Sequence, residues 1–446
     1  VRAKLMPIQT LETDYLIVGA GAMGMAFADV LFTENPKAEL IIVDRQAKPG
    51  GHWNNAYPYV ALHQPAAFYG VNSEKLGRGG GDLASGAEIL AYYERVMHRF
   101  LESGRVRFLP MSDYQQDGRI ISTVNSEASI EVRVACKVVD ATFMNVQVPS
   151  VTKPKYSVDA DVALVPPNDL PKISKPWARY NVIGAGKTGM DAILFLLDKG
   201  VDPDKIQWIT PNDAWLWERA PLQPGLAMHA FLQQLDAIKN SVSVDALFLA
   251  LEQSGSVCRI DTENLPVKWR CATIDRAELE NLRKIKNVVR QGRVQSISTT
   301  EISLDEGAIP TDAQTLHIDC TADGLARREP QPIFEPGKIT LQSVFMCQQV
   351  LSAAILAHLE QLKLSDDERN KLCKPVPHPE YKQDYATGLI ASFQNLLNIT
   401  PHMPVWLRKS RLYLMHHEPL HRYIWGSLKV QRSMSATKAS VEKMIA

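Results

Sequence analysis

The sequence lacks the cysteine patterns that mark metal sites or secreted disulfide frameworks. The chain has six cysteines: Cys136, Cys258, Cys271, Cys320, Cys347 and Cys373. They are scattered without CxxC spacing, which argues against both a structural zinc site and a disulfide-stapled extracellular domain. We therefore expect most of them to be buried thiols. The adjacent pair His416 and His417, followed by Glu418, is not a metal motif either, because neighbouring side chains on a helix point about 100° apart.

The sequence also lacks an excess of charge and any long apolar run. Basic and acidic residues number 49 each, and no Lys/Arg block is interleaved with aromatic residues. Nucleic acid and membrane surfaces are therefore not favoured as partners. No segment approaches the roughly 18 consecutive apolar residues of a membrane span, and residues 1–14 have no apolar core before a cleavage site. We expect a cytoplasmic protein that acts on a small molecule.

What the chain does have is enough apolar content for large cores and a glycine pattern that occurs twice. With 446 residues and 45% hydrophobic content it is long enough for about three domains. The first copy of the pattern is YLIVGAGAMGMAFADVLF, in which Gly19, Gly21 and Gly24 follow a β-prone run and open an apolar helix. The three glycines permit a tight turn, approach of backbone to a pyrophosphate, and close helix packing. This pattern predicts a dinucleotide site.

A second β-prone run supports that prediction. Residues 40–43 end in Asp44 and Arg45, which places an acidic side chain where it can accept hydrogen bonds from a ribose. The sequence then continues through Gly50 and Gly51 to Trp53.

The second copy of the glycine pattern is YNVIGAGKTGMDAILFLLDKG. Gly184, Gly186 and Gly189 repeat the spacing, with Lys187 and Thr188 inside the turn. The pattern again predicts a strand, a phosphate-binding turn and a helix. Lys187 is either a phosphate contact or an ordinary solvated side chain. Two such turns indicate two nucleotide sites, one for an electron donor and one for an electron carrier.

The proposed architecture is an α/β protein with two nested Rossmann-like dinucleotide-binding domains. Proline accumulates between residues 149 and 177, which suits an extended crossover between domains. We assign residues 1–165 and 316–446 to the first domain and residues 166–315 to the second, with an inserted helical segment at about 216–265. Residues 316–325 are interpreted as the strand and glycine turn that return to the first domain. Residues 129–134 are expected to form a strand paired with residues near 120–124.

The residues after Asp44 carry a resemblance to a known family. The acid, the spacer and the Gly-Gly-x-Trp turn, together with FYGVNSEKLG at residues 68–77, resemble the flavin-containing and Baeyer-Villiger monooxygenases. The resemblance implies FAD at the first turn, NADPH or NADH at the second, and O2 as co-substrate. It implies oxygenation of a nitrogen, a sulfur or a ketone carbon through a flavin C4a-hydroperoxide.

The same resemblance assigns individual residues. Asn72 would lie at the reactive face of the flavin, although an Asn at this place can equally cap a turn. Gln64, Asp323 and Gly324 would contact the flavin cofactor. Small residues at 352–354 would allow close approach of backbone to the flavin ring, or would simply pack a helix.

Two departures keep other functions open. The family's Phe-x-Gly-x-x-x-His motif ahead of the second turn is absent, which favours a reductase or dehydrogenase without oxygenation. Pro211, Asn212 and Asp213 stand where NADPH-dependent relatives place an Arg, with Arg219 several residues later, so NADH remains an alternative. A non-catalytic flavin-fold binding protein is a third possibility. Without a CxxxxC pair after the first turn, dithiol chemistry is not expected. The expected partners are a small substrate and O2, with no metal and a homodimer as one option.

Overall fold

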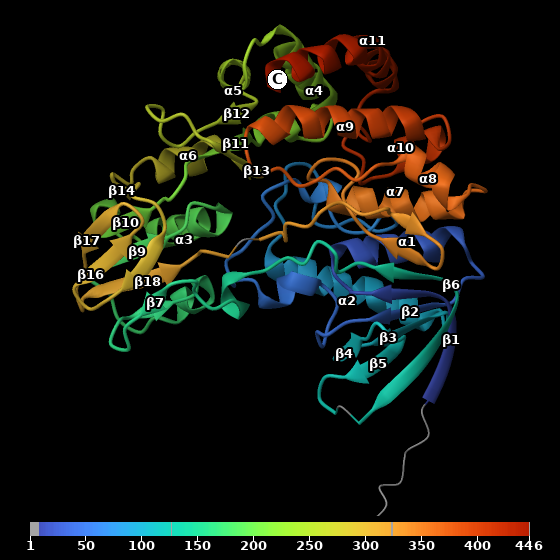
Figure 1. Cartoon of the computed structure of the whole chain (residues 1–446), viewed down its shortest axis with the longest axis horizontal. Coiled ribbons are helices and arrows are strands. Elements are labelled where there is room, and N and C mark those ends of the chain that lie inside the picture. Colours follow the sequence, from blue (N-terminus) through green and yellow to red (C-terminus); the bar gives the residue numbers. More distant parts are fainter. Residues whose placement is uncertain (1–8, 126, 323, 446) are drawn as a thin grey trace, which may run out of the picture.

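The protein is described here by a computed structural model covering residues 9–125, 127–322 and 324–445. Figure 1 shows the first sheet, which contains β1 to β6, at the lower right and a second β-rich region, which contains β9, β10 and β18, on the left. Helices lie above both. The strands of the first sheet are β1 (Gln9–Val18), β2 (Leu40–Val43), β3 (Val106–Leu109), β4 (Ser112–Tyr114), β5 (Arg119–Ser122), β6 (Ser129–Asp140), β19 (Phe334–Glu335) and β20 (Lys338–Thr340).

The first sheet is built on a parallel ladder in the order β20-β6-β1-β2-β3. All four residues of β2 are buried, as expected for a strand covered on both faces. The chain moves outward from β1 in one direction to β2 and β3, and in the other direction to β6 and β20. The loops after β1 and β6 therefore diverge, which opens a crevice at their carboxyl ends, where open α/β sheets bind ligands. The predicted pairing of residues 129–134 with 120–124 is confirmed, because Ile120 lies opposite Ile130.

The second sheet repeats this arrangement. Its strands are β8 (Leu164–Val165), β9 (Arg179–Ile183), β10 (Ile206–Ile209), β14 (Asn287–Val289) and β18 (Thr315–Asp319). They are parallel in the order β14-β10-β9-β18-β8, so the corresponding crevice lies between the ends of β9 and β18. A smaller sheet stands beside it and consists of β7 (Ser157–Val158), β15 (Val294–Ile297), β16 (Glu301–Leu304) and β17 (Gly307–Pro310).

One sequence expectation about these sheets is wrong. Residues 316–319 do not return to the first sheet, because β18 pairs with β9 along its whole length. The return is made by β19 and β20, and β20 joins β6. At the other end, β7 and β8 already belong to the second group of strands, upstream of the expected crossing at residue 165. The chain thus enters the second group of strands before residue 165 and leaves it after β18. The exact limits of the two domains stay a prediction.

Two buried helices pack against each other beside the first sheet. They are α1 (Ala22–Glu34) and α7 (Gln349–Gln361). Small residues on both helices are fully buried, among them Ala26 and Ala28 on α1 and Ala353, Ala354 and Ala357 on α7. Small side chains let helix backbones approach closely. The expected helix near residues 352–354 is therefore present, and its small residues pack a helix pair.

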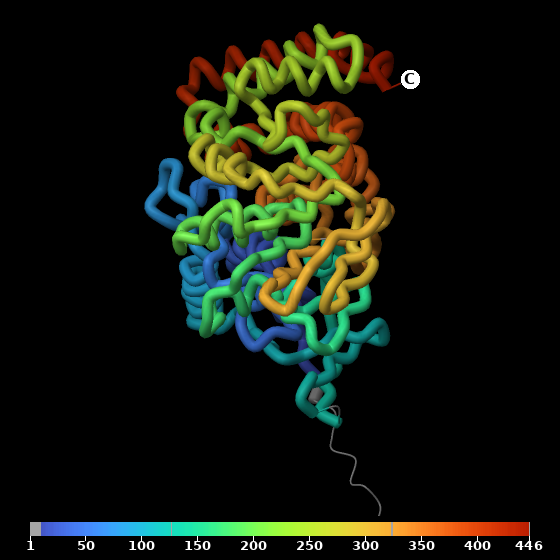
Figure 2. Tube along the Cα trace, turned by 90° about the vertical axis from the view of Figure 1, so that its left-hand side faces the viewer, coloured from blue at the N-terminus to red at the C-terminus, as the bar shows by residue number. Residues whose placement is uncertain are grey.

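The remaining helices are α2 (Gly86–Glu102), α3 (Lys187–Asp198), α4 (Ala227–Asn240), α5 (Val244–Gln253), α6 (Arg276–Leu282), α8 (Asp366–Leu372), α9 (Gln383–Ile399), α10 (Pro404–Lys409) and α11 (Leu420–Ile445). Of these, α2 lies beside the first sheet and α3 beside the second, while α4, α5, α9 and α11 lie in the upper part of Figure 1. Figure 2 shows the chain as stacked layers, with α11 and part of the 216–265 segment at the top. The expected helical segment is thus present as α4 and α5, and α11 packs on α4 and α9. Among the described residues, no helix is long and apolar enough to cross a membrane.

A short sheet of tryptophan-bearing strands connects these layers. It has the order β12-β11-β13 and consists of β11 (Ala214–Glu218), β12 (Val257–Cys258) and β13 (Lys268–Ile274). Trp217 and Trp269 pack edge to face at 5.0 Å, and Phe248 of α5 and Tyr385 of α9 pack against Trp269. This aromatic cluster fixes β13 between the helices and the loops below it.

Candidate functional site

The first glycine turn lies at the crevice between β1 and β6. Gly19 has a φ of 104°, which side-chain-bearing residues rarely adopt, and it is close to Ala141 and Thr142 after β6. A Cβ on Gly24 would overlap the carbonyl oxygen of Gly19 and lie 3.2 Å from Ala141 Cβ. Helix α1 begins directly after Gly21, whose lack of a side chain leaves the N–H groups of the first turn without a cap. The turn can therefore present N–H groups to an anion.

Gly51 and Asp44 extend this turn. A Cβ on Gly51 would lie 2.9 Å from Gly21 Cα, so the two glycine turns meet with no room for a side chain at position 51. Asp44 follows β2, and its two carboxylate oxygens accept from the backbone N–H of Ala20 at 2.6 Å and of Gln46 at 2.7 Å. Burial raises the pKa of Asp44. The acid thus lies at the glycine turn, as the sequence indicated, and its contacts there are with backbone.

The other residues predicted to bind the first nucleotide differ in their burial and in the groups that they contact. Trp53 is buried in the short helix Gly51–Asn55 and donates its Nε1–H to the hydroxyl of Tyr69 at 2.8 Å. Arg45 points to the surface, where its Nε lies 2.6 Å from Asp113. Gly324 has a φ of 72° and accepts a backbone hydrogen bond from Gln147, whereas Asp323 lies outside the described residues.

The second glycine turn lies at the matching crevice between β9 and β18. Gly184 has a φ of 122°, and a Cβ there would lie 2.8 Å from the carbonyl oxygen of Cys320, directly after β18. A Cβ on Gly189 would overlap the carbonyl oxygen of Gly184, whereas one on Gly186 would meet nothing within 4 Å. Helix α3 begins at Lys187, directly after Gly186. The geometry therefore repeats the first turn, with Gly186 open on its outer side.

Lys187 is neither solvated nor free. Its Nζ pairs with Asp191 one turn along α3 and lies 3.7 Å from Glu278. Asp191 also accepts from the hydroxyl of Tyr57 at 2.6 Å, which links the second turn to the chain that follows Trp53. Thr188 occupies the first turn of α3 beside Lys187. An arriving anion would therefore compete with two carboxylates for this lysine.

The corner beyond β10 holds an arginine that the sequence did not identify. Arg290 follows β14, the neighbour of β10, and its guanidinium lies 2.8 Å from Asp213 and 3.0 Å from Asp261. Neighbouring Asp213 and the Asp261 pairing raise the pKa of Arg290, with the hydrogen bond to Asp213 as the largest cause. Arg259 also faces Asp261, so the carboxylates of this corner are already matched by two guanidinium groups. Arg219, the alternative candidate, is elsewhere: it is buried and pairs with Asp275 and Glu278.

Gln64 lies in a loop that other parts of the chain hold in place. Arg219 donates to the carbonyl oxygen of the preceding residue, His63, at 3.0 Å, and Thr273 of β13 donates to the same carbonyl. Gln64 itself accepts from Nε2 of Gln348, directly before α7, at 3.3 Å. Burial lowers the pKa of His63 to about 3, so its ring is neutral at neutral pH. The loop is therefore fixed from two directions.

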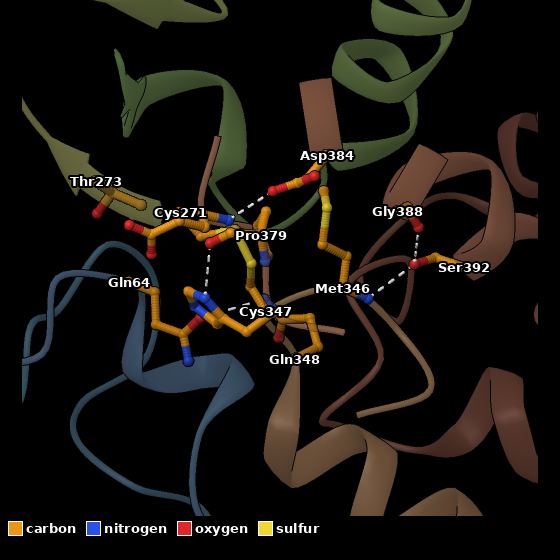
Figure 3. Close-up of a disulfide and its surroundings, with 12 residues drawn as sticks. Gln64, Cys271, Thr273, Met346, Cys347, Gln348, Pro379, Asp384, Gly388 and Ser392 are labelled. Carbon is orange, nitrogen blue, oxygen red and sulfur yellow. Dashed lines mark hydrogen bonds between the residues drawn. A yellow bond between two sulfur atoms is a disulfide. The ribbon is translucent and has the colours of Figure 1, made fainter. Parts of the chain in front are cut away.

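A small enclosed cavity of about 50 Å³ lies beside this loop. Gln64, Thr273, Cys347 and Gln348 form its polar lining, and aromatic and aliphatic side chains, including Phe68, Trp217 and Phe231, form the rest. Figure 3 shows Gln64, Thr273, Cys347 and Gln348 gathered around this place. An apolar cavity with a few polar groups is the usual form of a small-molecule site.

Asn72 is held by the C-terminal part of the chain. Its Oδ1 accepts from the hydroxyl of Ser410 at 2.8 Å. The adjacent Arg411 is buried and donates to the backbone carbonyls of Val71 at 2.6 Å and of residues 66 and 69. Burial lowers the pKa of Arg411. Ser73, on the other side, donates to the buried carboxylate of Asp29. Asn72 is thus positioned by both neighbours, a function that no sequence motif indicated.

Most of the six cysteines were expected to be buried thiols, and three of them are. Cys271 and Cys347 form a disulfide with a Cα–Cα distance of 6.5 Å, within the usual range for such bonds. Cys258, Cys320 and Cys373 are buried thiols and Cys136 is an exposed one. Within the described residues, His378 lies beside this bridge: a nitrogen of its ring and the two sulfur atoms lie within 4.8 Å of one another.

No protein-family model matches the chain. It is similar to the uncharacterized protein Rv2000 of Mycobacterium tuberculosis and to the uncharacterized protein Mb2023 of Mycobacterium bovis. Each is 45% identical over 428 residues, which cover 92% of this chain and 79% of the relative.

Solved structures of monooxygenases resemble the chain over most of its length. An ε-caprolactone-bound cyclohexanone monooxygenase matches with a TM-score of 0.53 at 12% identity, covering 95% of this chain and 98% of that one. A steroid monooxygenase bound to NADP matches with a TM-score of 0.51 at 13% identity, covering 81% and 85%. At such low identity these matches show a common fold.

Proposed function

We propose that this chain, a member of the family of the uncharacterized Mycobacterium proteins, is an FAD-dependent, NAD(P)H-consuming oxidoreductase of monooxygenase type. Its fold is that of the cyclohexanone and steroid monooxygenases, which supports this proposal. The observation that carries the proposal is the pair of glycine turns. Each lies at the crevice between diverging strands of a parallel sheet, and each has glycines where a Cβ would collide with backbone. Two nested Rossmann-like domains are the architecture that this pair of turns supports.

The first turn fits FAD. Gly21 and Gly51 face each other across a space that a side chain would fill, and the uncapped start of α1 supplies N–H groups for a pyrophosphate. Asp44 lies within reach of the same turn and can exchange its backbone contacts for ribose hydroxyls. Bound there, FAD would supply the electron transfer and oxygen activation, and the protein would supply position and exclusion of water.

The second turn fits a nicotinamide dinucleotide, and its corner fits NADH better than NADPH. The steroid monooxygenase of the same fold is bound to NADP. In this chain, however, Arg290 is already shared between Asp213 and Asp261. A 2′-phosphate would have to compete with Asp213 and Asp261 for Arg290, whereas a 2′-hydroxyl can donate to Asp213. We therefore propose NADH as the preferred donor.

Asn72 is the side chain that we assign to the reactive face of the flavin. Its Oδ1 is engaged by Ser410, which orients the amide so that its N–H groups can donate elsewhere. A fixed amide donor can stabilise negative charge as it develops on a reacting oxygen. The substrate would be a small organic molecule oxygenated at nitrogen, sulfur or a ketone carbon.

A reductase or dehydrogenase without oxygenation is the second candidate, and one observation favours it. The segment ahead of the second turn, residues 156–170, contains no histidine and no glycine, so the motif of the monooxygenases is absent. Rapid mixing of the anaerobically reduced protein with O2 separates the two candidates. The monooxygenase proposal predicts a transient species whose absorbance differs from both oxidised and reduced flavin. Direct reoxidation without such a species supports the reductase.

Asn72→Ala tests the site within the same experiment. We expect the transient species to decay faster and more hydrogen peroxide to be released per NADH consumed. Ser410→Ala is the matched control for the orientation of the amide and should give an intermediate effect. If Asn72→Ala leaves both the decay and the peroxide yield unchanged, Asn72 is not at the reactive face.

A further inference from the structure

The disulfide joins two segments that are distant in sequence and both unusual in backbone. Cys271 lies within β13 and Cys347 lies two residues before α7, at a sequence separation of 76. Cys271 has a φ of 58° and Cys347 a φ of 61°, and within the described residues few side-chain-bearing positions have a positive φ. Left-handed backbone at such residues costs free energy and concentrates at functional sites. Two such residues bonded to each other make this bridge a candidate site.

Both cysteines are connected to the loop of His63 and Gln64. On the β13 side, the backbone N–H of Thr273, two residues after Cys271, lies 3.3 Å from the ring nitrogen Nδ1 of His63. On the α7 side, Gln348 directly follows Cys347 and donates to Gln64. Cys347, Gln64 and Gln348 also line the same small cavity, as Figure 3 shows. The bridge is therefore next to the place that the sequence assigned to the flavin through Gln64.

A second cavity, of about 370 Å³, is lined by His378, whose ring lies close to the two bridged sulfurs, and by Arg270, the residue before Cys271. Its other charged side chains include Arg327 and Glu380. His378 donates from Nδ1 to the carbonyl oxygen of Pro379 at 3.0 Å, which leaves Nε2 as a proton acceptor. Burial lowers the pKa of His378 to about 4, so the ring is neutral at neutral pH. A neutral imidazole beside two sulfurs and a polar cavity can pass protons between them.

We propose that Cys271 and Cys347 are a redox-active pair that accepts two electrons from the reduced flavin, with His378 as the proton carrier. The proposal rests on the proposed function, because the flavin is the electron donor. The S–S bond breaks and two S–H bonds form. Reduced anionic flavin gives two electrons and one proton and returns to its oxidised form, and solvent in the larger cavity gives the second proton. Once a second two-electron reduction by the nicotinamide donor has reduced the flavin again, the loaded protein stores four electrons, two on the flavin and two on the thiols.

An anaerobic reductive titration of the flavin-loaded protein with dithionite tests this inference. Flavin absorbance is followed together with alkylation of thiols, which mass spectrometry assigns to individual cysteines. We expect two equivalents of two-electron reductant per bound flavin, and new alkylation at positions 271 and 347. The double variant Cys271→Ser/Cys347→Ser should take one equivalent. Cys136→Ser, which removes an exposed thiol, should take two, as the unaltered protein does.

Two controls identify the path of electrons and protons. Protein stripped of flavin should keep the bridge intact under the same reductant, because the electrons are expected to pass through the flavin. His378→Gln should keep the two-equivalent stoichiometry and the rate of flavin reduction while slowing the appearance of the two thiols. A purely structural role of His378 would leave that rate unchanged.

The other outcomes each contradict the inference in a recognisable way. A flavin-loaded protein that takes one equivalent and keeps the bridge has a structural disulfide. Alkylation of both cysteines before any reductant is added, or stoichiometric zinc in the purified protein, shows that no disulfide is present. A protein that binds no flavin removes the proposed function and this inference together, whereas an unreduced bridge beside a reduced flavin removes the inference alone.

Discussion

Two alanine substitutions in the first glycine turn separate its role in packing from its role in binding. In Gly24→Ala the new methyl group would overlap the carbonyl oxygen of Gly19 and lie 3.1 Å from its carbonyl carbon. These are backbone atoms that cannot rotate away, so α1 must move from the sheet. Substitutions that overpack a protein core suggest a loss of about 3 kcal/mol of unfolding free energy for such a shift. Alanine regains about 1 kcal/mol of helix propensity. The expected net loss of unfolding free energy is about 2 kcal/mol.

Gly21→Ala should behave in the opposite way. Its φ of −76° suits alanine, and the nearest atom to the new methyl group would be Gly51 Cα at 3.6 Å, an ordinary contact. The change at the N-cap of α1 should cost less than about 1 kcal/mol. The methyl group would nevertheless occupy the space between the two glycine turns. We expect the flavin dissociation constant to rise about tenfold or more, which corresponds to roughly 1.4 kcal/mol.

The assay compares two quantities for each variant. Urea unfolding of the flavin-free protein gives the free energy of unfolding, and quenching of flavin fluorescence on titration gives the dissociation constant. The flavin-free form is needed because a ligand that binds only the folded state would add its own stabilisation. The reasoning fails if Gly24→Ala is as stable as the unaltered protein, or if folded Gly21→Ala binds flavin with unchanged affinity.

Three further predictions concern other parts of the molecule. Burial lowers the pKa of His317 to about 4, below its unfolded value of about 6.5. Because the folded protein holds this ring neutral, up to ~3 kcal/mol of unfolding free energy should be lost as the pH falls from 6.5 to 4. His317→Gln should flatten the fall in urea midpoint over this range. Arg411→Met should lower the unfolding free energy by about 3 kcal/mol, because buried carbonyls lose their donors, and should reproduce the peroxide release of Asn72→Ala. Asp213→Ser should remove one of the two carboxylates that pair with Arg290 and shift the ratio of kcat/KM for NADPH over NADH upward by about tenfold, measured by steady-state kinetics.

Local patterns predicted the parts of the fold that depend on neighbouring residues. The strand at residues 40–43 has the expected limits, and both glycine turns lead into helices. Four glycines, Gly19, Gly24, Gly184 and Gly189, are required by their backbone angle or by contacts within a few residues or with the adjacent strand, so the spacing carries this information. The segment at about 216–265 was expected only as an inserted helical region without a placement in the fold, and it contains α4 and α5.

Membership of a sheet was not predictable in the same way. Only Leu316 and Ile318 of β18 are apolar, yet all five of its residues are buried. Since the central strands of both sheets are parallel, this short segment contains no sign of which neighbour it pairs with. The strand was assigned to the wrong sheet for that reason.

The side chains that position the site depend on contacts between distant segments. Arg411 reaches the loop before Asn72 across about 340 positions, and Arg290 meets Asp213 across 77. The disulfide is the same case, because the sequence shows two isolated cysteines and only the fold brings them together. A single sequence offers no spacing rule for such pairs.

The central claim is that one turn holds an electron carrier and the other its donor. Anaerobic titration of the flavin-loaded protein with NADH, and separately with NADPH, tests it directly by the visible spectrum. The account predicts that NADH bleaches the flavin band and that NADPH does so at higher concentration. A bound flavin that neither nucleotide reduces would contradict it, because the second turn would then play no part in hydride transfer.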